Sequence, residues 1–449
     1  MFLRTVKLKD FPWNGWLQLG IESKPAAAWN PIAGFSDAAG RLVWSALADP
    51  PLLPEPRGDA WIPNRVRATA VTSTPAVEVP ADALTPDPRT GGLRPAGPGV
   101  VAGTRLVYRV LASKFHDETK MSAADLLDPF AFAFRVSARD PVVARATAML
   151  RGELIAVRVV TIDAEVQDLG ELQIIHEVPL VEVYLKHAID PAYAAAVAPP
   201  WSATPWELTA LMEGAVERGY AAFSETEAKR RGVPWLDLVR DRKLHGQLTA
   251  LAATFERQAY VPATLRGLVT VEQARQRWAA LRRFARTHGH LLVTNGPYRL
   301  GKWSNESVVL GVFRDFSYRL GVGTYDRYAL PLRAWAARVE RRGDRLEIEA
   351  DVETVVRSER SYTLVREPFR PAPAGERLRV PMLVARYVVV GNGAEVVSAG
   401  VSEQLDGGRL VVDLTGRLKP GAYRLALALA LDDNLVNPEV KVIGYRVAD

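Results

Sequence analysis

The chain has 449 residues, of which 48% are hydrophobic and 24% are charged, so its composition is that of a globular protein and not of a disordered one. Lys and Arg number 57 against 51 Asp and Glu, and a formal net charge of +6 spread along the chain does not indicate a nucleic-acid partner. Cysteine is absent, which excludes disulfides, thiolate metal ligands and cysteine nucleophiles.

No targeting or membrane segment is predicted. The start MFLRTVKLKDFPWNGWLQLG lacks the apolar run of a secretory signal. No segment approaches the roughly 18 consecutive apolar residues of a transmembrane helix, so we expect no membrane span.

The first hundred residues are rich in tryptophan and proline. Their short apolar runs indicate loops and short strands and not helices. The segment 85–99, TPDPRTGGLRPAGPG, predicts an irregular excursion or linker because of its many Pro and Gly. The tryptophans of this region are Trp13, Trp16, Trp29, Trp44 and Trp61.

Strand and helix signals alternate over the next ninety residues. GTRLVYRVLAS predicts a strand, and Ser122 and Asp125 then stand at the two positions of a capping box that begins a helix. Pro129 is expected to kink or shorten this helix. LIAVRVVTID and LQIIHEVPLVEVYLKHAI predict strands, although the second can end as a helix.

Residues from about 205 to 290 form a helical block. Thr270 and Gln273 predict a second capping box. The run Lys229–Arg231 is expected to end a helix before Gly232. Helical spacing then predicts a buried stripe of Val271, Ala274, Trp278, Leu281 and Ala285, with Arg275, Arg282, Arg283 and Arg286 outward.

The stretch that begins at Thr294, TNGPYRLGKWSNESVVLGVFRDFSYRLG, predicts a β-hairpin. From about residue 332 strands follow one another with turn signals between them. Leu346, Ile348, Ala350 and Val352 alternate with acidic residues, as in a half-buried antiparallel strand. About seven such strands in some 115 residues are typical of an immunoglobulin-like β-sandwich.

Enzyme motifs are missing, because the P-loop, nucleophile-elbow and HExxH patterns do not occur. His116 and Asp117 in KFHDETKMSAAD could perform acid–base chemistry, but their place between a strand and a capped helix favours a structural turn. His288 and His290 could ligate a metal, but the end of a helix explains them better. We therefore expect no enzyme activity, no cofactor and no metal site.

The eleven tryptophans have two interpretations. They could line a groove for an extended ligand, since aromatic platforms bind at low entropic cost. Burial in the cores that anchor the loops is favoured for most of them.

Two stretches resemble the extracellular solute-binding proteins of the peptide, opine and nickel ABC importers, known as solute-binding family 5. LVYRVLASKFHDETKMSAADLLDPFAFAF is similar to the family's strand, His-Asp-Gly-Thr turn and helix start, and NGPYRLGKW followed by SVVLGVFRDFSY is similar to its Gly-Pro-Tyr hairpin. AWNPIAGFSDAAGRLVWSAL is similar to an early Asn-Pro segment. The resemblance covers about residues 26–330; Glu118 replaces the family's turn glycine, and Asn295 stands where the family has glycine or threonine.

The resemblance implies an α/β (mixed α+β) fold with two domains. By the resemblance, residues 1–330 would form a periplasmic-binding-protein-like lobe. The strand pattern predicts that residues 331–449 form a C-terminal immunoglobulin-like β-sandwich, where the family has a second lobe.

The resemblance further implies a periplasmic substrate-binding component of an ABC importer that captures a small solute, such as a peptide, without covalent chemistry and delivers it to an ABC permease. The alternative is a non-enzymatic envelope scaffold or interaction protein built on such a lobe. The expected ligand-binding residues are Trp29, Asn30, His116, Asp117, Asn295, Tyr298 and Trp303.

Overall fold

The computed structural model describes most of the chain. The described residues are 19–21, 24–55, 61–87, 90–168, 173–304, 306–315, 317, 332–357, 362–371, 382–431, 434, 436 and 438–447. Trp13, Trp16 and the expected domain boundary at 330/331 lie outside these residues.

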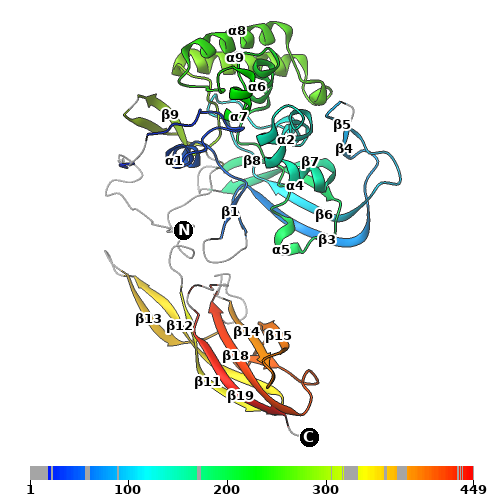
Figure 1. Ribbon diagram of the computed structural model, residues 1–449, viewed down its shortest axis with the longest axis vertical. Helices are drawn as coiled ribbons and strands as arrows, with labels where there is room; N and C mark the ends of the chain where they lie inside the picture. The colour runs from blue at the N-terminus through cyan, green and yellow to red at the C-terminus, as the bar shows by residue number, and fades with distance from the viewer. Residues whose placement is uncertain are drawn as a thin grey trace. The chain divides into compact units, whose positions relative to one another are not determined.

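The chain divides into two compact units, which we call the α+β unit (within Pro12–Pro54 and Ala60–Leu320) and the two-sheet unit (within Gly321–Asp449). Both are built on antiparallel strand pairs, so the protein has a mixed α and β structure with mostly antiparallel sheets (Figure 1). None of the helices described here has both the length and the apolar character needed to cross a membrane.

The α+β unit is centred on a six-stranded sheet with the order β3-β6-β8-β7-β4-β5. A large hydrophobic core joins this sheet to the helices, and it includes Tyr108 of β6, Phe130 of α2 and Trp278 of α9. A smaller cluster with Ala102, Ala156 and Tyr184 also lies on this sheet. The strands are β3 (Val66–Glu78), β4 (Leu84–Asp87), β5 (Gly92–Pro95), β6 (Val101–Val110), β7 (Leu154–Asp168) and β8 (Gln173–Leu185), and the short pair β1 (Leu52–Pro54) and β2 (Trp61–Pro63) stands apart from them.

Both predicted capping boxes are confirmed. Ser122 begins α2 with Asp125, and Thr270 begins α9 with Gln273. The helices are α1 (Ala38–Leu47), α2 (Ala123–Val136), α3 (Pro141–Ala146), α4 (Ala148–Glu153), α5 (Pro191–Ala194), α6 (Trp206–Glu217), α7 (Glu225–Arg231), α8 (Arg242–Gln258) and α9 (Val271–His288), with the 3₁₀ turn η1 (Ala263–Leu265).

Several local expectations were wrong. The early segment contains a helix, α1, whose N-cap Asp37 accepts a hydrogen bond from the amide of Gly40. The Pro-rich segment 85–99 contains most of the β4–β5 hairpin, which proline tolerates because it lies at the edge of the sheet. Helix α2 is not shortened at Pro129 and continues to Val136, with ten of its fourteen residues buried. Val271 is 58% exposed and lies outside the buried stripe.

The other helix-end and hairpin predictions are confirmed. Helix α7 ends with Lys229–Arg231, and Gly232 adopts the left-handed conformation after it. The strands β9 (Tyr298–Trp303) and β10 (Val308–Val312) form the predicted hairpin, joined through a turn in which the amide of Ser304 donates to the carbonyl of Ser307.

In the two-sheet unit, two antiparallel sheets enclose one core. Leu346, Ile348, Ala350 and Val352 of β12 are buried, which confirms the predicted alternation. One sheet has the order β11-β12-β17-β16 with β13 also paired to β12, and the other has the order β15-β14-β18-β19. The strands are β11 (Ala334–Arg342), β12 (Arg345–Arg357), β13 (Tyr362–Pro368), β14 (Leu383–Val390), β15 (Val396–Ser402), β16 (Leu405–Asp406), β17 (Arg409–Asp413), β18 (Gly421–Leu431) and β19 (Val440–Val447).

Candidate functional site

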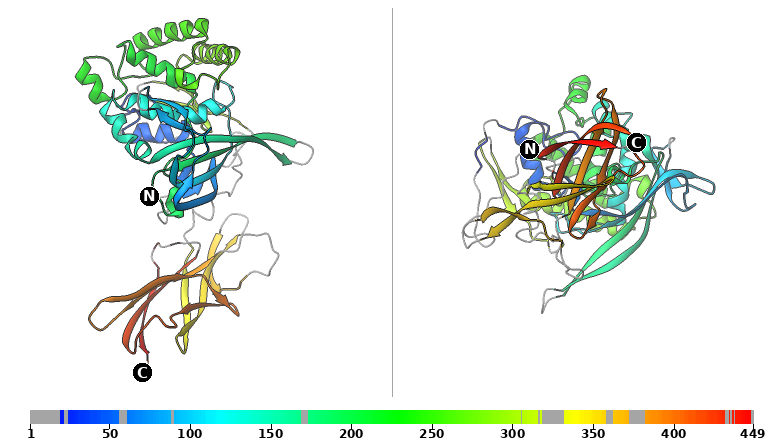
Figure 2. Two further views of the ribbon diagram at one scale, coloured as in Figure 1. Left: turned by 90° about the vertical axis from the view of Figure 1, so that its right-hand side faces the viewer. Right: turned by 90° about the horizontal axis from the view of Figure 1, so that it is seen from below.

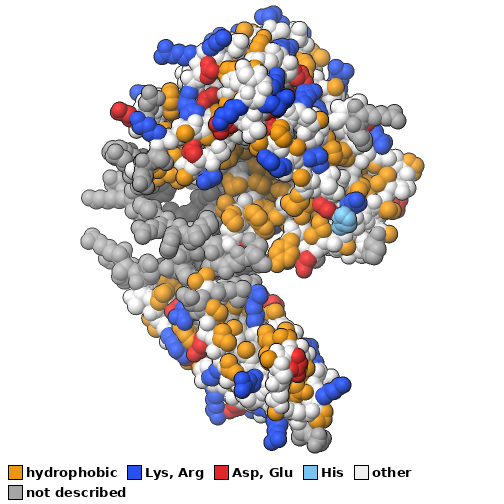
Figure 3. Space-filling view, in the orientation of Figure 1, with side chains coloured by type: hydrophobic (Ala, Val, Ile, Leu, Met, Phe, Trp, Pro, Cys, Tyr) orange, Lys and Arg blue, Asp and Glu red, His pale blue; other side chains and the backbone are white. Residues whose placement is uncertain are grey.

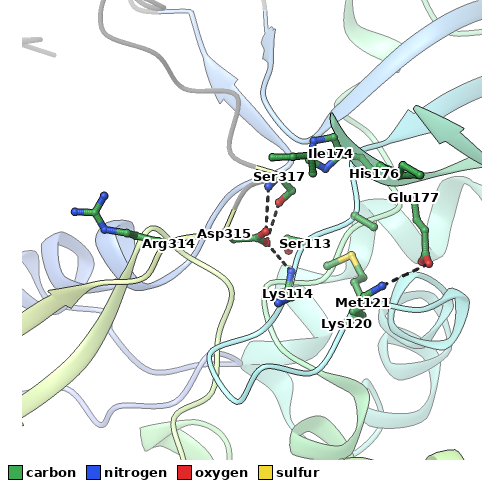
Figure 4. A pocket seen from close by; sticks show the side chains of 12 residues that line it. Ser113, Lys114, Lys120, Met121, Ile174, His176, Glu177, Arg314, Asp315 and Ser317 are labelled. Atoms are coloured by element: carbon green, nitrogen blue, oxygen red, sulfur yellow. Dashed lines mark hydrogen bonds and ion pairs between the residues drawn. The ribbon is translucent and has the colours of Figure 1, made fainter. Parts of the chain in front are cut away.

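A pocket of about 210 Å³ lies in the α+β unit, between the start of β8, the loop after β6 and the segment that follows β10 (Figure 4). Its apolar part is formed by Met121, Ile174 and Ile175. Its polar part contains both signs of charge. The remaining lining residues are Ala112, Ser113, Lys114, Lys120, His176, Glu177, Arg314, Asp315 and Ser317.

Asp315 is the most firmly held charge of this pocket. Its carboxylate accepts hydrogen bonds from the amide of Lys114 at 2.7 Å and from the amide and hydroxyl of Ser317 at 3.0 and 2.8 Å. Donors to a carboxylate stabilise its ionised form. Figure 4 shows the side chain of Arg314 turned away from Asp315. The pocket therefore presents a fixed anion beside an apolar surface.

Lys120 and Glu177 form an ion pair elsewhere in the pocket. Their Nζ and Oε1 atoms are 3.9 Å apart, and both side chains are more than half exposed. An exposed pair of this kind contributes at most about 1 kcal/mol, so either partner can exchange it for a charged ligand group at low cost.

Asn295 connects this pocket to three other segments of the chain. It is fully buried, and its Nδ2 donates to the hydroxyl of Ser113 in the pocket wall at 3.3 Å and to the carbonyl of Ser202 at 3.1 Å. Its Oδ1 accepts from the amide of Asp49 at 3.3 Å. A side chain with these partners fixes the pocket wall and does not itself reach a ligand.

His116 holds the start of the hairpin from the other side. Its amide donates to the carbonyl of Thr294 at 2.8 Å, and its Nε2 lies 2.9 Å from the carbonyl of Gly296. Because a carbonyl only accepts, Nε2 carries a proton. Burial lowers the pKa of His116 to about 4, so the ring is neutral at pH 7. Its Nδ1 lies 3.1 Å from the hydroxyl oxygen of Thr294, whose proton is donated to the carbonyl of Leu47.

Asp117 is buried in the turn that follows His116. Its Oδ1 accepts from the amide and hydroxyl of Thr119, whereas its Oδ2 has no hydrogen-bond partner. Burial raises the pKa of this carboxyl group above its usual range. Asp117 and His116 are therefore not an acid–base pair of the usual kind, since both are buried, Asp117 is bonded to Thr119 of its own turn, and His116 is bonded to the start of the hairpin.

A buried arginine near this turn escaped the sequence reasoning. Arg277 of α9 donates from Nη2 to Asp125 at 2.6 Å and from Nε to Glu207 at 2.9 Å, and both carboxylates are fully buried. Burial raises the pKa of Glu207 to about 7 even though Arg277 opposes the shift. The signal was present in the helical spacing, because Arg277 lies on the stripe between Ala274 and Leu281.

Trp29 and Asn30 lie in the core and not in the pocket. The Asn30 side chain donates to the carbonyls of Phe223 and Leu236 and accepts from two amides of its own turn, so its hydrogen-bonding capacity is used. Trp29 is fully buried, and its ring meets Trp303 edge-on with 6.3 Å between centroids.

The remaining candidates, Tyr298 and Trp303, belong to β9 and are half-buried. The structure thus brings His116, Asp117 and Asn295 into one region. Tyr298 and Trp303 belong to the hairpin, and Trp29 packs against Trp303. None of the seven candidates lines the pocket itself. Asp315 was missed, although its Asp-x-Ser spacing is a signal for a side chain that caps a turn.

Comparison of the chain with models of known protein families gave no match, and a search of curated proteins gave none either.

Proposed function

We propose that this protein is the substrate-binding component of an ABC-type importer and captures a small solute non-covalently in the pocket beside Asp315. The observation that carries the proposal is that the two stretches similar to solute-binding proteins meet through His116 and Asn295, and that Asn295 bonds directly to Ser113 in the pocket wall.

The lining supports a ligand with a short apolar body and charged ends, such as a small peptide. Ile174, Ile175 and Met121 offer apolar contact, Asp315 offers an acceptor for an ammonium group, and Lys120 can pair with a carboxylate. In this proposal the α+β unit is a periplasmic-binding-protein-like lobe, and the two-sheet unit is an immunoglobulin-like sandwich. The proposal also entails a periplasmic location beside an ABC permease, and no enzymatic turnover.

The test is a thermal-shift screen with short peptides and small zwitterionic metabolites. A ligand that binds only the folded state raises the melting temperature by an amount that grows with the logarithm of its concentration above its Kd. Lys120→Met should reduce the shift, whereas Lys229→Met, which removes an exposed lysine of α7 also paired with a glutamate, should leave it unchanged. A broad library that gives no shift in the wild-type protein would contradict the proposal.

A second candidate function is an envelope scaffold. It is favoured by one observation: the α+β unit is followed by the two-sheet unit and not by a second mixed lobe in the described residues. Isolation of the tagged protein from envelope extracts separates the two, because a scaffold should retain a stoichiometric protein partner other than a permease or its ATPase.

A further inference from the structure

Strands β7 and β8 extend beyond the strands that flank them. Strands β7 and β8 pair with each other from Leu154↔Leu185 to Asp168↔Gln173. The neighbouring strands stop earlier. Strand β4 pairs with β7 only at Leu84↔Val157, and β6 pairs with β8 only as far as Arg109↔Leu180. Residues 159–168 and 173–179 thus form a two-stranded ribbon, which projects from the sheet in Figure 2.

One face of this ribbon is apolar and exposed. Val166 lies opposite Ile175, and Ile162 lies on the same face, since alternate residues of a strand share a face. Their exposed fractions are 53% for Ile162, 56% for Val166 and 69% for Ile175. A ribbon of two strands is only marginally stable in water, so an apolar face on such a ribbon indicates a partner surface.

The ribbon is also acidic. Residues 159–168 and 173–179 contain Asp163, Glu165, Asp168 and Glu177 and no Lys or Arg. Two of these acids have weak partners, because Glu165 pairs with Arg109 and Glu177 pairs with Lys120 at exposed positions. By the register, Asp168 and Glu177 lie on the apolar face, whereas Asp163 and Glu165 lie on the other. The apolar face thus carries acids and no Lys or Arg, and it would favour a basic surface.

The chain carries such a surface on the β15-β14-β18-β19 sheet. Val388, Ala426 and Val442 stand side by side in the register, and the neighbouring row contains Val401, Ala428 and Val440. Valines of this outer face are 36% to 64% exposed, although the opposite face of the same sheet already forms the core. Arg386, Arg424 and Arg446 lie on this outer face by the register. Lys441 lies on the inner face and donates to the carbonyl of Ala336, and the four strands contain no Asp or Glu.

The two surfaces match in kind and in size. Both have exposed apolar side chains, and the charged residues beside them are of opposite sign. Apolar side chains reach the surface of both units in the view of Figure 3. Ten residues of strand span about 33 Å, whereas four strands are about 15–19 Å wide, so the ribbon is long enough to cross the sheet. One such contact alone is small for a stable interface.

We infer that the ribbon of one copy packs on the outer face of the β15-β14-β18-β19 sheet of a second copy, and that the exchange is reciprocal. Two identical contacts then close a two-fold dimer, which doubles the buried area. Opposite charges on the two surfaces favour this pairing over ribbon with ribbon or sheet with sheet, because each of those would bring like charges together.

Sedimentation of the full chain over a range of concentrations tests the inference. We expect a monomer–dimer equilibrium that weakens as salt is raised. Val166→Asp on the ribbon and Val442→Asp on the sheet should each weaken the dimer at least about tenfold, since each places a charge in an apolar contact and neither residue lines the pocket. Val271→Asp, a matched exposed valine on α9, should leave the equilibrium unchanged.

Mixing the two weakened variants is the decisive experiment. Val166→Asp keeps an intact sheet face and Val442→Asp keeps an intact ribbon, so a mixed pair contains one undamaged contact. We expect the mixture to form a heterodimer at concentrations where each variant alone is a monomer. A wild-type protein that stays monomeric, a dimer insensitive to both substitutions, or a mixture without heterodimer would each overturn the inference.

Discussion

The turn after His116 shows how a single residue can be poorly suited to its own backbone. Glu118 has a φ of 70°, in the left-handed region that glycine adopts without steric cost. The side chain of Glu118 adds little stability, because it is 63% exposed and its Oε2 lies 3.8 Å from Nζ of Lys114. Glu118 stands where solute-binding family 5 has glycine, and its left-handed backbone conformation destabilises this turn.

Glu118→Gly should therefore stabilise the α+β unit by about 1 kcal/mol, because it relieves the left-handed conformation. Thermal or urea unfolding measures the change. Glu118→Ala is the matched control, since it also removes the ion pair but keeps the Cβ atom, and it should bring no gain. Equal effects of the two substitutions would mean that backbone strain is not the cause.

At the scale of elements, the backbone at the start of the hairpin lies very close to the backbone at the end of α1. The amide of Gly296 donates to the carbonyl of Leu47 at the end of α1, and a Cβ atom at Gly296 would lie 2.3 Å from that carbonyl carbon. The Asn-Gly-Pro triplet is therefore fixed by packing against α1 as well as by the turn.

Gly296→Ala should separate the hairpin from α1 and destabilise the α+β unit by more than about 2 kcal/mol, since a Cβ at 2.3 Å forces backbone to move. Gly311→Ala in β10 of the same hairpin is the control, because nothing lies within 4 Å of its Cβ position. Denaturant midpoints of the two variants check the prediction, and similar values for both would contradict it.

Elements set by neighbouring residues were predictable from the sequence, and those set by distant packing were not. The capping pair Ser122 and Asp125 acts within one helical turn, so its signal is local. Helix α1 was missed because the surrounding tryptophans and prolines outweighed the cap signal of Asp37. The β4–β5 hairpin was missed because its edge position depends on β7.

The candidate site follows the same rule. The resemblance singled out His116 and Asn295, which the structure joins through the start of the hairpin. The pocket was not predictable, since Ile175 and Asp315 come from segments 140 residues apart and meet only in the folded chain. Arg277 was not singled out because an arginine on an apolar stripe is usually at its edge.

At the scale of the whole molecule, buried titratable groups set the pH dependence of stability. Burial lowers the pKa of His116 and His290 from 6.5 to about 4. Their stabilising contribution is therefore complete above pH 6.5 and is lost as the pH falls towards 4. Burial raises the pKa of Asp128 to about 6 and of Glu207 to about 7. These two acids act in the opposite direction to the histidines: their contribution to the free energy of unfolding is present at low pH and is lost as the pH rises through those values.

His116→Gln should reduce the loss of stability between pH 6.5 and 4.5, because Gln can still donate to the carbonyl of Gly296 but does not titrate. One histidine accounts for up to about 1.4 kcal/mol per pH unit in this window. Urea unfolding at a series of pH values measures the slope, with His187→Gln, at an exposed histidine, as the control. An unchanged slope in His116→Gln would contradict the assignment.

The hydrogen bonds of Asn295 have a consequence for biosynthesis. They tie Asp49, Ser113 and Ser202 to a residue 246, 182 and 93 positions later in the chain. A nascent polypeptide must therefore wait until about three hundred residues have left the ribosome before this unit can close, and its high contact order makes that closure slow. During this interval Asp49, Ser113 and Ser202 lack the side chain that joins them in the folded unit.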